Sequence, residues 1–201
     1  MQQDTIEVRQ DERFDESCLA DYLRGKLPGT DGPLTVRQFG GGSANLTYLL
    51  HFSDNEYVLR RPPLGEVAKS AHDMKREYTV LSVLHQAFPY APHAYLYCDD
   101  LDILGTDFFI MERRQGIVIR RQMPESYTNV AHAPRRISLA MVDALADLHA
   151  VDTAAIGLND LGKPAGFIER QVEGWYKRWQ AAKTDDVAEI EAVGLTQIAF
   201  G

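Results

Sequence analysis

The sequence contains little cysteine: Cys18 and Cys98 are its two cysteines in 201 residues, and neither belongs to a CxxC pair. It therefore gives no support for a disulfide framework or a zinc site. It also lacks any stretch that approaches the ~18 consecutive apolar residues of a membrane helix. Its acidic start, MQQDTIEVRQDE, does not have the basic-then-apolar order of a signal peptide. We therefore expect a cytoplasmic protein without a membrane partner.

Positive charge is also scarce, since 21 Lys and Arg face 29 Asp and Glu, a formal net charge of −8. Binding to nucleic acid depends largely on neutralising phosphates with Lys and Arg, so this balance argues against a nucleic-acid partner. The hydrophobic fraction of 45% and the charged fraction of 25% are ordinary for a globular protein with a sizeable core. Any anionic ligand must therefore be held by a local cationic site.

The order of apolar and breaker residues predicts strands first and helices later. A helix that starts near Asp15, with this residue as its acidic N-cap, precedes a hairpin, a third strand that ends at Pro62, and a second helix. That second helix is predicted to start at Ser70, with Asp73 at capping-box spacing, before two more strands. The expected strands are 34–39, 46–52, 57–61, 94–98 and 107–112, with turn residues at 99–106 and later helices at 134–150, at 165–182 and from 185.

This order predicts an α+β fold in two parts. Residues 1–112 would form an N-terminal α+β lobe, a five-stranded antiparallel sheet with a helix. Residues 113–201 would form a hinge and part of an α-helical C-terminal lobe. The boundary is placed where the strand pattern gives way to helical periodicity.

Three consecutive glycines, Gly40, Gly41 and Gly42, separate the two strands of the predicted hairpin. Glycine tolerates the positive φ of tight turns, so an ordinary hairpin explains them. Missing Cβ atoms also let backbone amides approach phosphate oxygens closely. The second interpretation needs a nearby cation and a partner for it.

The third predicted strand offers that cation. Side chains alternate along a strand, so Val58 and Arg60 share one face, which could line a cleft, while Tyr57 and Leu59 share the other. On the next helix Glu77 flanks the apolar stripe, where a carboxylate turned toward the core needs a partner. The alternative is a solvated glutamate, with Arg60 bonded to surface carboxylates. A separation within hydrogen-bond range would favour the first interpretation.

The segment FFIMERRQG ends the fifth predicted strand. Its apolar residues run into Met111, Glu112 and Arg113 and then a glycine, which is typical of a hinge. Exposed backbone N–H and C=O groups there could pair with an adenine edge. The simpler interpretation is a buried strand followed by a loop, with Met111 in the core.

Several segments together resemble the aminoglycoside-phosphotransferase-like family: GPLTVRQFGGGSANLTYLL, YVLRRPPLG, SAHDMKREYTVL, DFFIMERRQG and LADLHAVD. The resemblance covers about residues 14–179 and is in particular to kinase-like domains attached to, or encoded beside, acyl-CoA dehydrogenases. It implies a protein-kinase-like fold that binds ATP, with Mg²⁺, between two lobes. It also implies transfer of the γ-phosphoryl group to a small-molecule hydroxyl, with a hydroxyacyl-CoA-type compound as the suggested acceptor.

By position, the resemblance implies that Gly41, Gly42 and Ser43 belong to a loop that covers the phosphates. Arg60 would stand where kinases have a lysine, Glu77 would be its partner, and the segment after the fifth strand would be the adenine hinge. Arginine is a departure from kinases generally. It leaves open which phosphate is contacted, because the two cations are not interchangeable.

A larger departure is an absence. Members of this family carry a His-Gly-Asp segment whose Asp orients the acceptor hydroxyl, then an Asn and a metal-binding Asp. None of the six histidines of this chain is followed by Gly-Asp. We therefore assign no catalytic and no metal-binding residue, and expect a C-terminally truncated form of a longer kinase. These 201 residues alone should bind nucleotide weakly or undetectably and transfer no phosphate.

The alternative function is a non-catalytic nucleotide-responsive or partner-binding module. Self-association would then occur through the incomplete helical lobe, whose exposed seam would be apolar. Trp175 and Trp179, one helical turn apart, are expected to pack on the missing part or, in a complete chain, on another subunit.

Overall fold

The computed structural model describes residues 4–40, 45–65, 73–119, 122–163, 165–185, 187–190 and 192. The chain divides into two compact units, Met1–Leu158 and Asn159–Gly201. The first unit contains the sheet and the helices α1 to α4, and the second contains α5. The lobe boundary after residue 112 stays a prediction.

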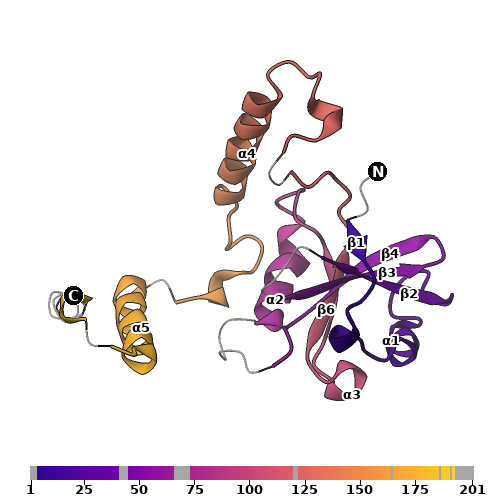
Figure 1. Ribbon diagram of the computed structural model, residues 1–201, viewed down its shortest axis with the longest axis horizontal. Coiled ribbons are helices and arrows are strands. Elements are labelled where there is room, and N and C mark those ends of the chain that lie inside the picture. Colours follow the sequence, from indigo (N-terminus) through magenta and orange to yellow (C-terminus); the bar gives the residue numbers. More distant parts are fainter. Residues whose placement is uncertain are drawn as a thin grey trace. The chain divides into compact units, whose positions relative to one another are not determined.

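Antiparallel pairing joins six strands into one sheet in the order β1-β2-β3-β4-β6-β5 (Figure 1). All five predicted strands are present, and β2, β3 and β5 have the predicted bounds. The sixth strand, β1, was not predicted, because two residues are too short to show an alternating pattern; it is held by pairing with β2. The strands are β1 Thr5–Ile6, β2 Leu34–Phe39, β3 Leu46–Phe52, β4 Asn55–Arg61, β5 Ala94–Cys98 and β6 Phe108–Glu112.

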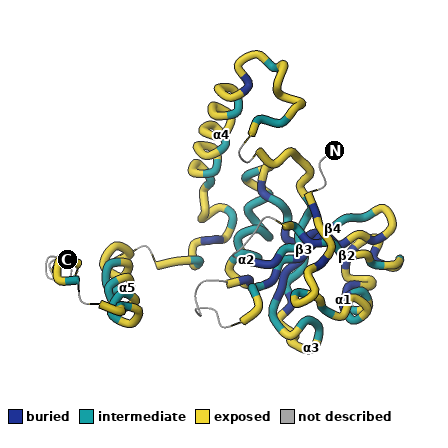
Figure 2. Tube along the Cα trace, in the orientation of Figure 1, coloured by how far each residue is buried: buried dark blue, intermediate teal, exposed yellow. Residues whose placement is uncertain are grey.

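Side-chain alternation gives the sheet two faces, and the strands form the most buried part of the molecule (Figure 2). The larger core lies on one face, where Leu59 is completely buried. α1 (Glu16–Leu23) contributes Leu19 to this core, and α3 (Leu101–Leu104) adds the partly buried Ile103. The N-cap predicted for α1 is confirmed, because the Asp15 carboxylate accepts hydrogen bonds from two N–H groups of its first turn.

The opposite face carries a smaller core under α2 (Met74–Leu84). Met74 of this helix and Phe109 of β6 are completely buried against Ala94 of β5. Neighbouring residues of β6 thus serve different cores, since Phe108 points to the larger one. The two-residue period of a strand accounts for this division.

The start of α2 differs from the prediction. Asp73 is not helical, with φ −82° and ψ 89°, and its carboxylate accepts a hydrogen bond from the Arg76 N–H at 2.8 Å. It is therefore the N-cap, a position that aspartate favours because its oxygen satisfies an otherwise unpaired N–H. A helix running through Asp73 was a wrong prediction, and Ser70 lies outside the described residues.

The predicted turn at 99–106 contains a single helical turn, α3. The Asp100 carboxylate caps it by accepting the Asp102 N–H at 3.0 Å. Gly105 ends it with φ 74°, a conformation that glycine adopts without steric cost. Local hydrogen bonding of short polar side chains explains why the segment reads as a turn in sequence.

The two later helices agree with the periodicity and expose much apolar surface. They are α4 (Ala133–His149) and α5 (Phe167–Ala182), and the irregular chain that joins them contains a 3-10 turn at Asn159–Leu161. Further 3-10 turns lie at Gln10–Glu12 and Glu125–Tyr127. The acidic helix predicted from residue 185 falls partly on residues that are not described. Throughout the described part of the chain, helices lack the combination of length and apolar character needed to cross a membrane.

Candidate functional site

Arg60 and Glu77 meet on the face of the sheet that α2 covers. Arg60 lies on β4, Glu77 lies in the first turn of α2, and Arg60 Nε is 2.8 Å from Glu77 Oε2. The predicted contact is therefore confirmed. The side chains are 32% and 36% exposed, so the pair is neither sealed from water nor freely solvated. Because the buried Nε–H is not aligned for a hydrogen bond, the contact is held as an ion pair.

Strand register places an apolar surface beside Arg60. Two residues before it on β4, Val58 lies opposite Leu49 of β3 and Met111 of β6. Directly opposed residues in antiparallel strands share a face, so these side chains adjoin one another. Val58 and Leu49 are 5% and 7% exposed, and Met111 is half-buried. The surface leads from the arginine toward the end of β6.

The end of β6 is attached to the connection between α2 and β5. Glu112 Oε2 accepts the backbone N–H of His93 at 3.2 Å and forms an ion pair with Arg114 at 3.2 Å. Arg114 in turn donates to the carbonyls of Pro89 and Ala91 at 2.9 and 2.7 Å. Glu112 and Arg114 both belong to the segment that was predicted as a hinge from its composition. Their contacts fix the position of the chain that follows β6.

The side chain of Arg113 is engaged in two ion pairs. Its Nη1 lies 2.5 Å from Glu56 Oε1, and its Nη2 lies 3.5 Å from Asp4 Oδ2. The guanidinium of Arg113 is thus already paired with two carboxylates.

Sequence reasoning missed Asn45. This residue is 8% exposed, and its Nδ2 donates to Glu77 Oε1 at 3.0 Å. The available signal was its position directly after the glycine-rich segment and before β3. Gly41, Gly42 and Ser43 lie outside the described residues, so their contact with phosphate stays a prediction.

Two histidines stack next to Glu112. The rings of His85, at the end of α2, and His93, before β5, have centroids 3.8 Å apart and planes inclined by 22°. The Tyr95 ring lies 4.5 Å from that of His93. Burial, and then repulsion from His85, lower the pKa of His93 against a weaker opposing effect of Glu112. The neutral imidazole is therefore favoured beside the segment after β6.

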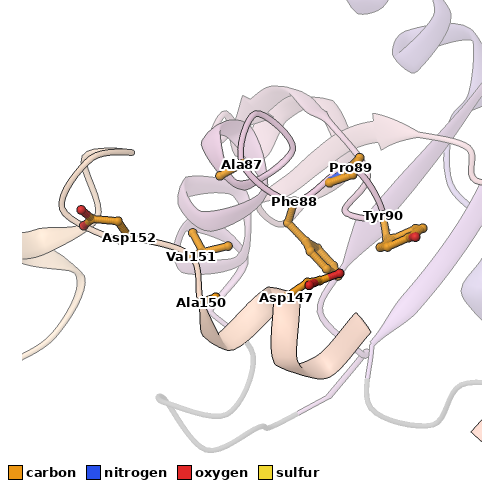
Figure 3. A pocket seen from close by; sticks show the side chains of 8 residues that line it. All are labelled: Ala87, Phe88, Pro89, Tyr90, Asp147, Ala150, Val151 and Asp152. Atoms are coloured by element: carbon orange, nitrogen blue, oxygen red, sulfur yellow. The ribbon is translucent and has the colours of Figure 1, made fainter. Parts of the chain in front are cut away.

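A cavity of about 500 Å³ lies elsewhere in the first unit (Figure 3). It is lined by residues 87–90, Asp147 and residues 150–152, which come from the connection after α2 and from the end of α4. Phe88 and Asp147 approach each other across it. None of the residues predicted for the site belongs to this lining.

An antiparallel sheet with a strand cation paired to a helix glutamate, and a hinge-like segment after the last strand, is the arrangement of a protein-kinase-like fold, although the cation here is arginine and not lysine. The chain belongs to the phosphotransferase enzyme family, whose family model matches residues 35–198. The matched region includes β2 from its second residue to α5, and therefore both Arg60 and Glu77.

Particular relatives make the likeness more specific. Over 189 residues the chain is 38% identical to acyl-CoA dehydrogenase family member 11 of Gallus gallus, covering 91% of this chain and 24% of that protein. It is 34% identical over 190 residues to family member 10 of Mus musculus, covering 93% and 17%. A solved structure described as an aminoglycoside phosphotransferase from Ralstonia eutropha has a TM-score of 0.68 and 32% identity, covering 90% and 52%. The chain thus spans at most about a quarter of these curated relatives and about half of the solved one.

Proposed function

We propose that this chain forms the nucleotide-binding part of an ATP-dependent phosphotransferase that acts on a small-molecule hydroxyl. The observation that carries the proposal is the 2.8 Å pair between Arg60 and Glu77, on the same face as the apolar Val58 and Met111. Protein kinases use such a pair to place a cation on the nucleotide phosphates. Membership of the phosphotransferase family supports the reaction class.

Arg60 has binding capacity left after its contact with Glu77. Among the described residues, its Nη1 and Nη2 have no hydrogen-bond partner, and the side chain is 32% exposed. A guanidinium can bind a phosphate through two N–H groups at once. Glu77 holds the arginine in place and balances its charge. Arg60 would therefore bind and orient the phosphate chain without making or breaking a bond itself.

The adenine ring would lie against the apolar surface of Val58, Leu49 and Met111. A mostly apolar floor with a few polar main-chain groups at its margin suits a heteroaromatic ring. The main chain of Arg113 would meet the adenine edge, while its side chain stays with Glu56. The adenine and the phosphates would then contact two different strands of one face, β6 and β4.

Magnesium accompanies ATP in the family pattern. In the part of the chain that is described, no group of three or more His, Cys, Asp or Glu side chains could hold a metal ion. These residues therefore do not fit a metal site of their own, and no step is assigned to a metal. With no His-Gly-Asp segment to position an acceptor hydroxyl, we propose that these 201 residues bind nucleotide weakly and transfer no phosphate.

The proposed acceptor class is a hydroxyacyl compound of the hydroxyacyl-CoA type. It rests on the relatives named as acyl-CoA dehydrogenase family members, which match more than nine-tenths of the chain. The solved neighbour is described as an aminoglycoside phosphotransferase, so an aminoglycoside is the competing class. A phosphotransfer assay with both classes distinguishes them in any longer form that is active.

Thermal denaturation tests the nucleotide site. Millimolar ATP should raise the melting temperature of the wild type, because a ligand that binds only the native state stabilises it. Arg60→Gln should lose this rise through loss of the phosphate-binding cation. The matched control is Arg37→Gln, which removes the arginine of β2 that is paired with Glu7, and this variant should keep the rise in melting temperature. An equal rise in Arg60→Gln, or phosphate transfer by the 201 residues, would contradict the proposal.

A partner-binding role is the second candidate, and exposed apolar surface favours it. Met141 and Val142 of α4 are 69% and 62% exposed, and Ile168 and Trp175 of α5 are 77% and 66% exposed. Apolar surface of this extent promotes association. We propose self-association through these helices as the alternative role, with or without bound nucleotide.

A further inference from the structure

Glu77 is held through both of its carboxylate oxygens. Oε2 faces Arg60 of β4 at 2.8 Å, and Oε1 accepts the amide N–H of Asn45 at 3.0 Å. The two partners come from different segments of the chain, because Asn45 directly precedes β3 and Arg60 lies on the neighbouring strand β4. The carboxylate of α2 is thus tied to two separate points of the sheet.

The two contacts act differently on Glu77. Arg60 attracts the carboxylate by charge, but an ion pair with about a third of each side chain exposed is screened by water and loosely oriented. The Asn45 amide adds no charge. It is buried and donates a directional hydrogen bond, so it fixes the rotation of the carboxylate plane. The oxygen presented to Arg60 is therefore set by Asn45.

We propose that Asn45 is a positioning residue that orients Glu77, and through it the Arg60 guanidinium, for the phosphate chain of a nucleotide. This inference rests on the proposed function and adds to it a residue with a defined task. Asn45 need not touch the nucleotide. Its effect should appear only in the part of the binding that depends on phosphate.

Asn45→Ala in the full chain provides the first test. Because the apolar surface and the hinge are untouched, adenosine binding should stay unchanged, whereas ATP binding should weaken about tenfold, the usual effect of losing one charge-assisted hydrogen bond. Chemical-shift titrations with each ligand give both values. On a Glu77→Gln background the same substitution should have little further effect, since the ion pair that Asn45 supports is already lost.

Thr47→Ala is the matched control. Thr47 lies opposite Arg60 on β3 and forms no hydrogen bond to Glu77 within the described residues. It should leave both ligands unaffected. Equal losses of ATP and adenosine binding in Asn45→Ala would reveal a merely structural role and overturn the proposal, as would unchanged ATP binding. A wild type that binds no ATP would instead overturn the proposed function.

Hydrogen exchange at Arg60 Nε tests the positioning role of Asn45 without a ligand, and so also when no ATP binding is detected. The Arg60 Nε–H is buried beside Glu77, so its proton should exchange slowly with water in the wild type. Exchange should be several-fold faster in Asn45→Ala and in the isosteric Asn45→Asp, which brings two negative charges together. Thr47→Ala should exchange like the wild type. The same exchange rate in all four proteins would overturn the positioning role.

Discussion

At the scale of single residues, the neighbouring arginines of β4 have different surroundings, one suited to stability and one to the proposed binding. Arg60 faces α2 and is partly exposed, whereas Arg61 faces the larger core and is 2% exposed. Arg61 Nη2 donates to the Glu12 carbonyl at 2.7 Å and to the Tyr48 hydroxyl at 2.8 Å. Alternation of side chains along the strand gives the two cations these different surroundings.

Replacing each arginine by methionine should separate the two roles. Arg61→Met removes two hydrogen bonds of a buried charged side chain and should lower the free energy of unfolding by about 2–4 kcal/mol. Arg60→Met removes a partly exposed ion pair and should cost about 1 kcal/mol or less. Urea denaturation measures both values. A loss for Arg60→Met as large as that for Arg61→Met would contradict the assignment of Arg60 to binding.

At the scale of elements, α2 joins the two halves of the proposed nucleotide site. Near its start Glu77 contacts Arg60, and beyond its end the connection to β5 is attached to the hinge by Arg114. The stack of His85 on His93 lies within this connection, beside Glu112. A displacement of the helix would therefore act on the phosphate side and the adenine side together.

The histidine stack should make stability fall with acid. The lowered pKa of His93 means that the native state binds protons less tightly than the unfolded chain. The contribution of His93 to the free energy of unfolding is therefore complete above its unfolded pKa of about 6.5. It is lost as the pH falls through the lowered pKa of the folded state. The charged groups facing it are His85 and Glu112, with Arg114 paired to the latter.

His93→Phe keeps a ring in the stack and removes the titration. Between about pH 7.5 and pH 5, the urea midpoint should fall further in the wild type than in this variant, by the linkage of proton binding to unfolding. His85→Gln should raise the pKa of His93, measured by NMR, because it removes a repulsive neighbour. Identical pH profiles for wild type and His93→Phe would show that the stack carries no protonation cost.

The elements that could be predicted from the sequence are those in which a side-chain pattern continues over several residues or a capping residue marks the end. The strands 34–39, 46–52 and 94–98 and the cap Asp15 follow from alternation and local hydrogen bonding. β1 has two residues and forms only by pairing, so no local pattern reveals it. Glu77 was identifiable as a flanking carboxylate that needs a partner, whereas Asn45 required knowledge of how β3 and α2 meet in space.

At the scale of the whole molecule, a chain of net charge −8 is proposed to bind an anion. The surrounding charge repels a nucleotide, so binding must rely on short-range contacts at Arg60 and on apolar contact with the adenine. The part of the chain that matches the family model, residues 35–198, contains both Arg60 and Glu77. The family relationship therefore covers the part of the sheet that carries this ion pair. The central claim is therefore local: one face of the sheet binds ATP.

Mapping of backbone amide shifts during a titration with ATP tests this claim most directly. The account predicts shifts, in the millimolar range of ATP, at Val58 to Arg60, at Glu77 and at Met111 to Arg113, with the last group also shifting with adenosine. Shifts confined to the cavity around Phe88 and Asp147, or no shifts at saturating ATP, would contradict it.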